Sequence, residues 1–399
     1  MFFQGITPDK DKCCGCLACV ETCPHLAISA SEDEDGFIMP TVDLSKCVEC
    51  GACEKVCPMR HSEDVLHVEV GTAYAAVNCN KKILLESSSG GIFSVIAESV
   101  LAEGGVVYGA AFDDNLQLCN IIVDNSNDLD KLYGSKYIQS KNNGIFKTIR
   151  DYLLKGVKVY YCGTGCQVAA LRLYLRKDYD NLITSDILCH GVPPQRVFDY
   201  TVKSLESKYK GRVVNYRFRD KSVWGWSCSS SCGIQKEKRI KYIGYDSSMD
   251  AYFNAFIESV MYRESCYVCP FAKGKRVGDI TLADFWGVEN YIHIPDVRNG
   301  VSAILVNSEK GLKELDKVRD RINLYAANIE DISKINRTLV CPSPRPKNRD
   351  DFFANFKRDP ERTMSMYVKE RNIKKRVVYT LRRNKFSNAI INVIKSLKK

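Results

Sequence analysis

The strongest constraint in the sequence is a duplicated cysteine motif near the N-terminus. Each copy reads C-x2-C-x2-C-x3-C-P. The two copies consist of Cys13, Cys16, Cys19, Cys23 and Pro24, and of Cys47, Cys50, Cys53, Cys57 and Pro58. Thiols spaced this closely cannot all meet the geometry of disulfides. The spacing is instead typical of proteins with two 4Fe–4S clusters, in which the fourth cysteine of each run completes the other cluster.

The repeat therefore predicts two clusters with exchanged fourth ligands. We expect one cluster on Cys13, Cys16, Cys19 and Cys57, and the other on Cys47, Cys50, Cys53 and Cys23. The intervening segment predicts two short strands around a turn at Asp35–Gly36, as in a compact ferredoxin module. A pair of zinc knuckles is the alternative, but zinc sites use four ligands in C-x2-C pairs, not eight in a duplicated register.

Length, hydropathy and charge limit the class of protein. The 399 residues allow two or three folded units. No apolar run is long enough to span a membrane, and the N-terminus lacks a secretory signal pattern, so nineteen cysteines fit a reducing cytoplasm. The net charge of +10 is weak evidence for nucleic-acid binding, because all of it lies in one segment. Residues 369–399 hold eleven Lys or Arg and one acidic residue, so the rest of the chain has no net charge. This basic tail is a candidate contact for an anionic membrane or an acidic protein, or else a solvated helix.

Alternating strand and helix patterns after residue 70 predict a larger α/β unit. Strand-like runs start at Val106, Val157, Asn181, Asp279 and Val301, and helical patterns cover 144–156 and follow Pro193–Pro194. Around Cys341 the chain becomes rich in proline and charge, which indicates the end of this unit.

Two stretches of this unit place small or reactive residues before a helix. The first begins at Ser87 and reads SSSGGIFSVIAESVL. Its free backbone amides could bind a pyrophosphate. Alternatively, the serine only caps the helix and the glycines only form a turn. YYCGTGCQVAALRLYL, from Tyr160, puts Cys166 at a helix start, where a thiol can act as a nucleophile, redox group or cluster ligand, or be a buried small residue.

A third four-cysteine site can form by convergence. Cys266 and Cys269 lie in a C-x2-C pair followed by proline, and Cys189 follows a predicted strand. Strand carboxyl ends collect on one side of an open α/β sheet, so these three thiols and Cys166 can meet there. On spacing alone, a 4Fe–4S cluster and a structural zinc ion both remain open.

Taken together, these residues resemble the coenzyme F420 hydrogenase/dehydrogenase beta subunit family. The matching elements, in family order between Gly71 and Val306, are SSSGGIFS, GSKYIQS, CGTGCQVAALR, CHGVP, and SCYVCPF followed by GDITLADFWG. Members resemble one another in binding FAD and one 4Fe–4S cluster in the α/β unit, and a ferredoxin module in front is a common attachment. Related proteins include beta subunits of deazaflavin-reducing hydrogenases and a plant chlorophyll-pathway reductase.

The resemblance implies a flavin site and a third cluster, and it leaves the catalytic residues unknown. The implied flavin-binding residues are Ser88, Ser89, Gly90, Gly91, Ser135, Lys136, Gly163 and Thr164. The implied ligands of the third cluster are Cys166, Cys189, Cys266 and Cys269. Two features depart from the family pattern: Gly165 replaces the usual proline, and Cys162 is an extra thiol that is either incidental or a substitute ligand.

The resulting hypothesis is an FAD- and 4Fe–4S-dependent oxidoreductase that acts as an adapter. A flavin exchanges a hydride as two electrons, whereas clusters carry single electrons. The expected partners are a ferredoxin-like electron donor or acceptor and a hydride-accepting substrate or carrier. That substrate is a deazaflavin or, in a bacterium lacking it, a surface-polysaccharide precursor. A non-catalytic electron-transfer subunit that feeds a partner enzyme is the alternative, with a structural zinc protein behind it.

The expected fold class is α+β, in three parts. A two-cluster ferredoxin domain is expected over 1–62, an α/β flavin- and cluster-binding domain over 70–345, and a basic helical tail over 346–399.

Overall fold

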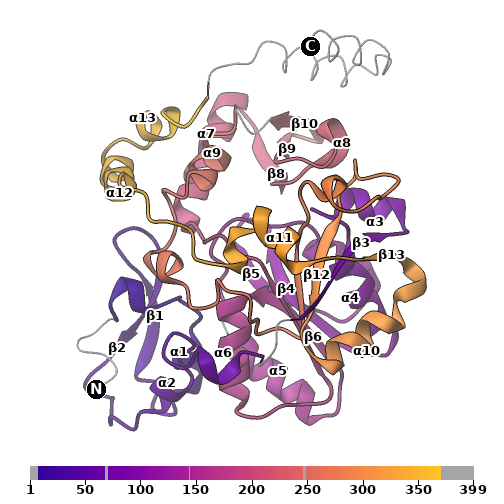
Figure 1. Cartoon of the computed structure of the whole chain (residues 1–399). Helices are drawn as coiled ribbons and strands as arrows, with labels where there is room; N and C mark the ends of the chain where they lie inside the picture. Colours follow the sequence, from indigo (N-terminus) through magenta and orange to yellow (C-terminus); the bar gives the residue numbers. More distant parts are fainter. Residues whose placement is uncertain (1–7, 68–70, 143, 246–248, 370–399) are drawn as a thin grey trace.

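The structure, a computed structural model, describes residues 8–67, 71–142, 144–245 and 249–369. Residues 8–67 form the N-terminal module, seen in indigo at the lower left of Figure 1. Its elements are α1 (Ala18–Thr22), β1 (Ile28–Glu32), β2 (Ile38–Val42) and α2 (Ala52–Lys55). β1 pairs with β2 in antiparallel register, and Asp33 Oδ1 accepts hydrogen bonds from two backbone amides of the turn between them. The predicted pair of short strands is confirmed.

Residues 71–369 form the large domain, which is built on an eight-stranded sheet in the order β13-β3-β12-β11-β7-β6-β4-β5. The strands are β3 (Thr72–Asn78), β4 (Val106–Phe112), β5 (Leu118–Val123), β6 (Val159–Thr164), β7 (Leu182–Ile187), β11 (Ile280–Asp284), β12 (Ser302–Val306) and β13 (Ile322–Ala326). The helices along this sheet are α3 (Lys81–Glu86), α4 (Ile92–Ala102), α5 (Ile145–Leu154), α6 (Gly165–Leu175), α10 (Glu309–Lys317) and α11 (Ile329–Ile335).

The central strands of the sheet run in one direction. β4, β6, β7 and β11 are successive parallel neighbours, whereas β5 and β12 pair antiparallel with their neighbours. The carboxyl ends of the four parallel strands therefore lie at one edge of the sheet. That edge is where open α/β sheets bind ligands.

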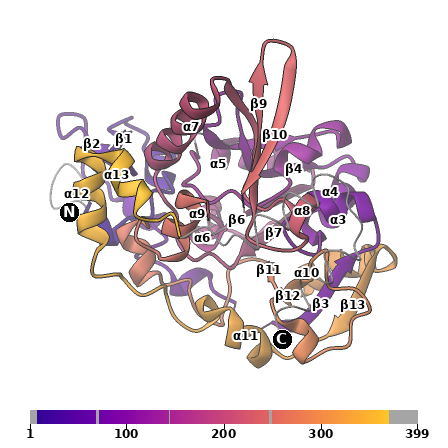
Figure 2. The same cartoon turned by 90° about the horizontal axis from the view of Figure 1, so that it is seen from above.

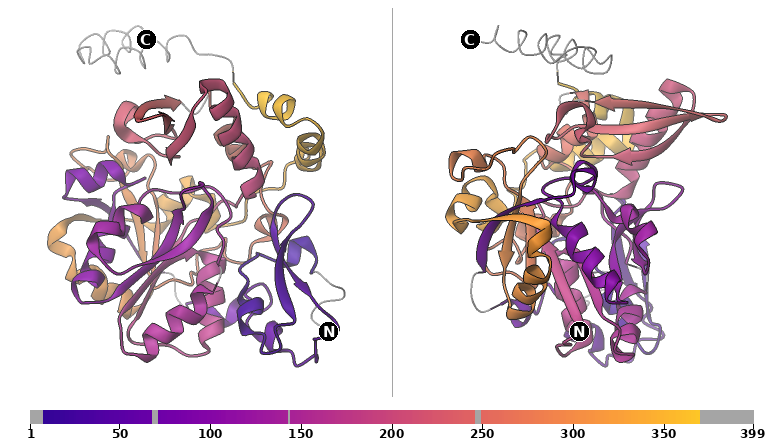
Figure 3. Two further views of the ribbon diagram at one scale, coloured as in Figure 1. Left: turned by 180° about the vertical axis from the view of Figure 1, so that it is seen from behind. Right: turned by 90° about the vertical axis from the view of Figure 1, so that its right-hand side faces the viewer.

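Apolar residues of both sheet faces are buried under helices. α4 covers one face, where alternate residues of β4 and β6 such as Val107 and Tyr160 pack. α5 and α6 cover the other face, together with Ala18 and Val56 of the N-terminal module. The module therefore lies beside α6 in the views of Figures 1 and 3.

A smaller layer lies above the sheet. It contains α7 (Gln195–Tyr209), β8 (Arg212–Arg217), α8 (Lys221–Trp224), β9 (Ser230–Lys236), β10 (Arg239–Tyr245), α9 (Ala251–Ile257), α12 (Arg349–Arg358) and α13 (Pro360–Ser365). β8, β9 and β10 form a three-stranded antiparallel sheet, whose β9–β10 hairpin projects from the molecule in Figure 2. An aromatic core that includes Phe198, Phe218 and Tyr252 holds this layer together.

The C-terminal segment differs from the expected basic tail. Phe352, Phe353 and Phe356 of α12 and Met364 of α13 are buried in the aromatic core. Charged residues at both ends of α12 concealed this packing in the sequence. The strongly basic stretch 370–399 lies outside the described residues. In the part of the chain that is described, no helix has the length and apolar character needed to cross a membrane.

The sheet depends on a buried ion pair between Asp186 and Arg276, whose side chains are 0% and 3% exposed and whose charged atoms are 2.6 Å apart. Asp186→Ala leaves the guanidinium buried without its partner, so we expect the free energy of unfolding to fall by about 3–5 kcal/mol. Urea denaturation followed by circular dichroism measures this loss.

The matched control is Asp296→Ala. It removes the ion pair with Arg298, whose side chain is 85% exposed, and should leave the urea midpoint unchanged. Equal midpoints for the two variants would contradict a stabilising role for the buried pair.

Candidate functional site

The first cavity of interest lies in the N-terminal module and is lined by four predicted cluster ligands. These are Cys13, Cys16, Cys19 and Cys57. The loop that carries Cys13 and Cys16 needs a left-handed residue at Gly15, whose φ is +69°. A Cβ there would lie 2.7 Å from Ile38 O and 2.8 Å from a guanidinium nitrogen of Arg263. Glycine therefore lets the cysteine loop close against β2.

The cysteine set predicted for the second cluster also lies in the module. Cys23, Cys47 and Cys53 pack around Ile28 and Val42, while Cys50 of the same set is exposed. Burial raises the pKa of Cys53, and the nearby Cys23 and Cys47 thiols raise it further. Three of the four predicted ligands are thus close together, and the fourth faces solvent.

The second cavity lies at the carboxyl ends of β6 and β7. Its lining includes the four cysteines predicted for a third cluster, Cys166, Cys189, Cys266 and Cys269. Convergence of strand ends therefore brings together thiols from three distant segments of the chain, as expected.

Local structure explains the position of Cys166. β6 ends at Thr164, and α6 begins at the next residue. The Thr164 amide donates to Gln167 Oε1 at 3.0 Å, and Thr164 Oγ1 lies 3.2 Å from Cys166 Sγ. The thiol is thus held in the first turn of a helix, at the edge of the sheet.

Cys162 lies elsewhere. Strand alternation along β6 turns it toward the α4 face, where it packs with the apolar cluster of that face. Cys166 packs on the opposite face. Burial raises the pKa of Cys162 to about 12, with Asp186 adding to the rise and Lys136 opposing it. This placement favours the incidental role for Cys162.

Cys14 links the two cavities. It lines both of them, as does Met59. The pKa of the Cys14 thiol is raised well above its ordinary value, chiefly by a hydrogen bond with Cys16. A second hydrogen bond, with Cys166, acts in the opposite direction. Motif spacing left Cys14 without a role, although its position beside Cys13 was the one available signal.

The cysteine groups enclose space and do not converge on a point. Within residues 8–369, as far as they are described, no three His, Cys, Asp or Glu side chains are arranged to hold a single metal ion. All nineteen cysteines lie in the described part of the chain and are free of disulfides. Each of the two cavities is lined by four predicted ligand thiols besides Cys14, and this donor chemistry fits 4Fe–4S clusters.

The residues predicted for flavin meet at the same sheet edge. Ser88 Oγ accepts a hydrogen bond from the Ser135 amide at 2.7 Å, so the serine–glycine turn touches the GSKY turn. Packing alone also requires a glycine at position 90, because a Cβ there would lie 2.2 Å from Ala76 O. These two turns therefore lie at the edge of the sheet where open α/β sheets bind ligands.

Lys136 is already engaged within the protein. Its ammonium donates to the carbonyls of Ala110, Lys131 and Tyr133 at 2.9–3.1 Å. Burial lowers its pKa to about 7. These contacts fix the loop after β5 to β4, and they leave the ammonium little capacity for a phosphate.

Sequence reasoning missed Arg219, which closes this edge. Its guanidinium donates to Asp284 at 2.9 and 3.2 Å and to the Ser88 carbonyl at 3.2 Å. It also lies 5.0 Å from the ring centre of Trp286, which stacks on Trp226 at 4.0 Å. No local motif contains Arg219, so only the tertiary contacts could identify it.

Comparison with known proteins agrees with these two parts of the chain. Residues 12–60 match the family described as 4Fe-4S dicluster domain. Residues 156–332 match the family that comprises the C terminus of the coenzyme F420 hydrogenase/dehydrogenase beta subunit. No curated protein matches the chain.

Twelve chains of solved structures match. One belongs to the F420-reducing NiFe hydrogenase complex from Methanosarcina barkeri, with 15% identity and a TM-score of 0.44, over 68% of this chain and 90% of that one. The two family matches confirm the resemblance seen in the sequence: the chain joins a 4Fe-4S dicluster domain to the C-terminal region of the coenzyme F420 hydrogenase/dehydrogenase beta subunit family.

Proposed function

We propose that the chain is an iron–sulfur flavoprotein oxidoreductase. It passes electrons between a ferredoxin-like one-electron pool and a hydride-accepting substrate or carrier, through FAD. The observation that carries this proposal is the adjacency of the two cysteine-lined cavities, because Cys14 and Met59 line both. A thin wall of side chains between two cluster sites suits transfer of single electrons from the N-terminal module to the large domain.

The chain's own residues have separable tasks in this proposal. One 4Fe–4S cluster would be held by Cys13, Cys16, Cys19 and Cys57, a second by Cys47, Cys50, Cys53 and Cys23, and a third by Cys166, Cys189, Cys266 and Cys269. Bound FAD would supply hydride exchange, as a pair of electrons, beside clusters that carry electrons singly. Arg276 lines the second cavity, and its ion pair with Asp186 balances its charge there.

The turn at Gly134–Ser135 is the open side of the proposed flavin site. The Ser135 amide of this turn donates to Ser88 Oγ, and Arg219 in turn donates to the Ser88 carbonyl. His190 lines the second cavity, where its ring can donate or accept a hydrogen bond.

The candidate substrates are the deazaflavin that the family resemblance implies or, in a bacterium that lacks it, a surface-polysaccharide precursor. We also propose the expected division of the chain into 1–62, 70–345 and 346–399, with the difference that α12 and α13 pack on the large domain. Membrane or acidic-protein contact through the basic tail falls on residues outside those described.

The first prediction concerns cluster content. Anaerobically purified protein should hold about twelve irons and as many sulfides, from three 4Fe–4S clusters, and one FAD. Cys189→Ala and Cys50→Ala should each lose about four irons, because each removes one ligand of one cluster. Iron, sulfide, zinc and flavin are measured on the same samples.

Cys162→Ala is the matched control and should keep the full iron content, since its thiol faces the α4 side of the sheet. Loss of about four irons from this variant would contradict the ligand assignment of the third cluster. About twelve irons without any flavin would contradict the oxidoreductase and leave the electron-transfer subunit.

The second prediction concerns the flavin position. Ser135 is exposed, so Ser135→Trp should leave the core intact while its ring fills the open side of the proposed site. We expect FAD content to fall at least tenfold, by roughly 1.4 kcal/mol of binding free energy or more, with iron unchanged. Absorbance of released flavin and iron analysis give both values.

The control is Ser204→Trp, at an exposed position of α7 that no flavin motif includes. It should keep wild-type FAD. A wild-type FAD content in the Ser135→Trp protein would show that the flavin does not bind at this edge of the sheet.

A further inference from the structure

Arg263 joins the two cysteine-lined cavities from the side of the large domain. Its amide donates to Val192 O at 3.1 Å, and its carbonyl accepts from the Cys266 amide at 2.9 Å. Val192 and Cys266 both line the second cavity. The backbone of Arg263 is therefore part of the support of the proposed third cluster site.

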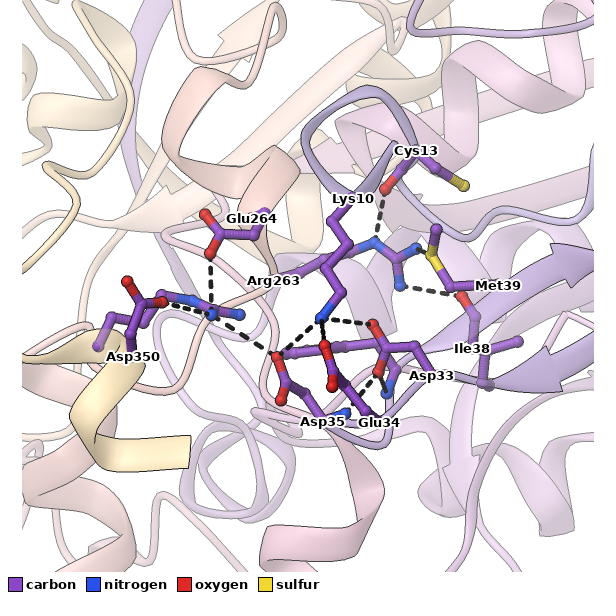
Figure 4. Close-up of polar contacts among 12 residues, drawn as sticks. Lys10, Cys13, Asp33, Glu34, Asp35, Ile38, Met39, Arg263, Glu264 and Asp350 are labelled. Atoms are coloured by element: carbon purple, nitrogen blue, oxygen red, sulfur yellow. Dashed lines mark hydrogen bonds and ion pairs between the residues drawn. The ribbon is translucent and has the colours of Figure 1, made fainter. Parts of the chain in front are cut away.

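The side chain of Arg263 reaches into the N-terminal module. Nε donates to the carbonyl of Cys13 at 2.6 Å, and one terminal nitrogen donates to Ile38 O at 2.9 Å. The other terminal nitrogen contacts Met39 Sδ, and the guanidinium lies 5.6 Å from the ring centre of Phe37. Figure 4 shows this side chain pointing at the three acceptors.

All three acceptors are neutral, although Arg263 is 2% exposed. A neighbouring buried arginine, Arg349, shows the usual alternative, because it forms ion pairs with Glu264 at 2.8 Å and with Asp35 at 3.7 Å. Among the residues that the structure describes, Arg263 has no such carboxylate partner. Burying a charge without a counter-charge is costly, so an anion nearby is expected.

Arg263 contacts residues that line both cavities. Its guanidinium is hydrogen-bonded to the carbonyl of Cys13, which lines the first cavity. Its backbone is hydrogen-bonded to Val192 and Cys266, which line the second. Thiolates that hold a cluster in either cavity would supply the missing negative charge.

We propose that Arg263 is a positioning residue that serves as a shared counter-charge for the clusters of the first and second cavities and raises both reduction potentials. The proposal rests on the proposed function, since it requires clusters in both cavities. A cluster held by four thiolates is anionic, and its reduction adds one electron. A fixed buried cation therefore stabilises the reduced form more than the oxidised form.

The test compares Arg263→Gln with Arg263→Lys in the full-length, cluster-loaded protein. Both lose the forked guanidinium, but only the lysine variant keeps a positive charge. We expect glutamine to lower the potentials of both clusters by at least ~59 mV, a tenfold change in the one-electron equilibrium. Lysine should lower them by less than half as much. Redox titration followed by electron paramagnetic resonance measures the potentials, with signals assigned through Cys50→Ala and Cys189→Ala.

Two controls separate the effect of the Arg263 charge on the potentials from the part that its side chain plays in packing the N-terminal module against the large domain. The cluster on Cys47, Cys50, Cys53 and Cys23 is an internal control, and its potential should not move. Arg349→Gln removes a buried guanidinium whose charge faces carboxylates, and it should lower the thermal midpoint with a smaller change in the two potentials.

Equal potentials in the glutamine variant and the wild type would overturn the proposal, as would an equal fall in the glutamine and lysine variants. A different result would contradict the proposed function. If the wild-type protein holds about eight irons, the third cluster is absent, and the potential of the first-cavity cluster still tests the role of Arg263.

Discussion

The carboxylate of Asp186 organises the part of the sheet on which both the fold and the second cavity depend. It ends the buried stretch of β7, accepts from Arg276 and from Thr281 Oγ1, and leaves no room for a side chain at Gly278. Because Arg276 also lines the second cavity, the strand ends cannot shift without moving the wall of that cavity. A hydrogen-bonded carboxylate here ties β7, β11 and the loop after Cys269 into one rigid edge.

The N-terminal module is fixed to this framework by contacts along its whole length. Glu21 accepts from the amide of Lys147 at the start of α5, and the Ile38 amide donates to Gln139 Oε1, both at 3.0 Å. Phe37 packs against Phe353 in the aromatic core, with ring centres 5.7 Å apart. A mobile ferredoxin domain would have to find its acceptor by diffusion, whereas this module holds its cavity beside the second one.

Local patterns predict much of this molecule. The spacing of the N-terminal cysteines, the strands beginning near Val106 and Val157 and the convergence of Cys166 with Cys189 all follow from periodicity and from the geometry of parallel sheets. The family matches then confirm the two-part character of the chain. Individual ligand and flavin assignments remain predictions.

What the sequence conceals are contacts between residues far apart in the chain. Arg263 and Cys13 are separated by 250 positions, and no periodicity links them. Lys136 resembles a phosphate contact in its motif, yet three carbonyls occupy its ammonium. α12 has charged residues on both sides of its phenylalanines, so its burial becomes evident only once α7 and α9 are in place.

The shared wall between the cavities also imposes an order on biosynthesis. Every cysteine of the first cavity lies within the first 57 residues, so all of its thiols are translated before the large domain. The second cavity needs Cys14 and Met59 from this module and Cys269 from far downstream. Its lining is therefore complete only after most of the chain has been translated.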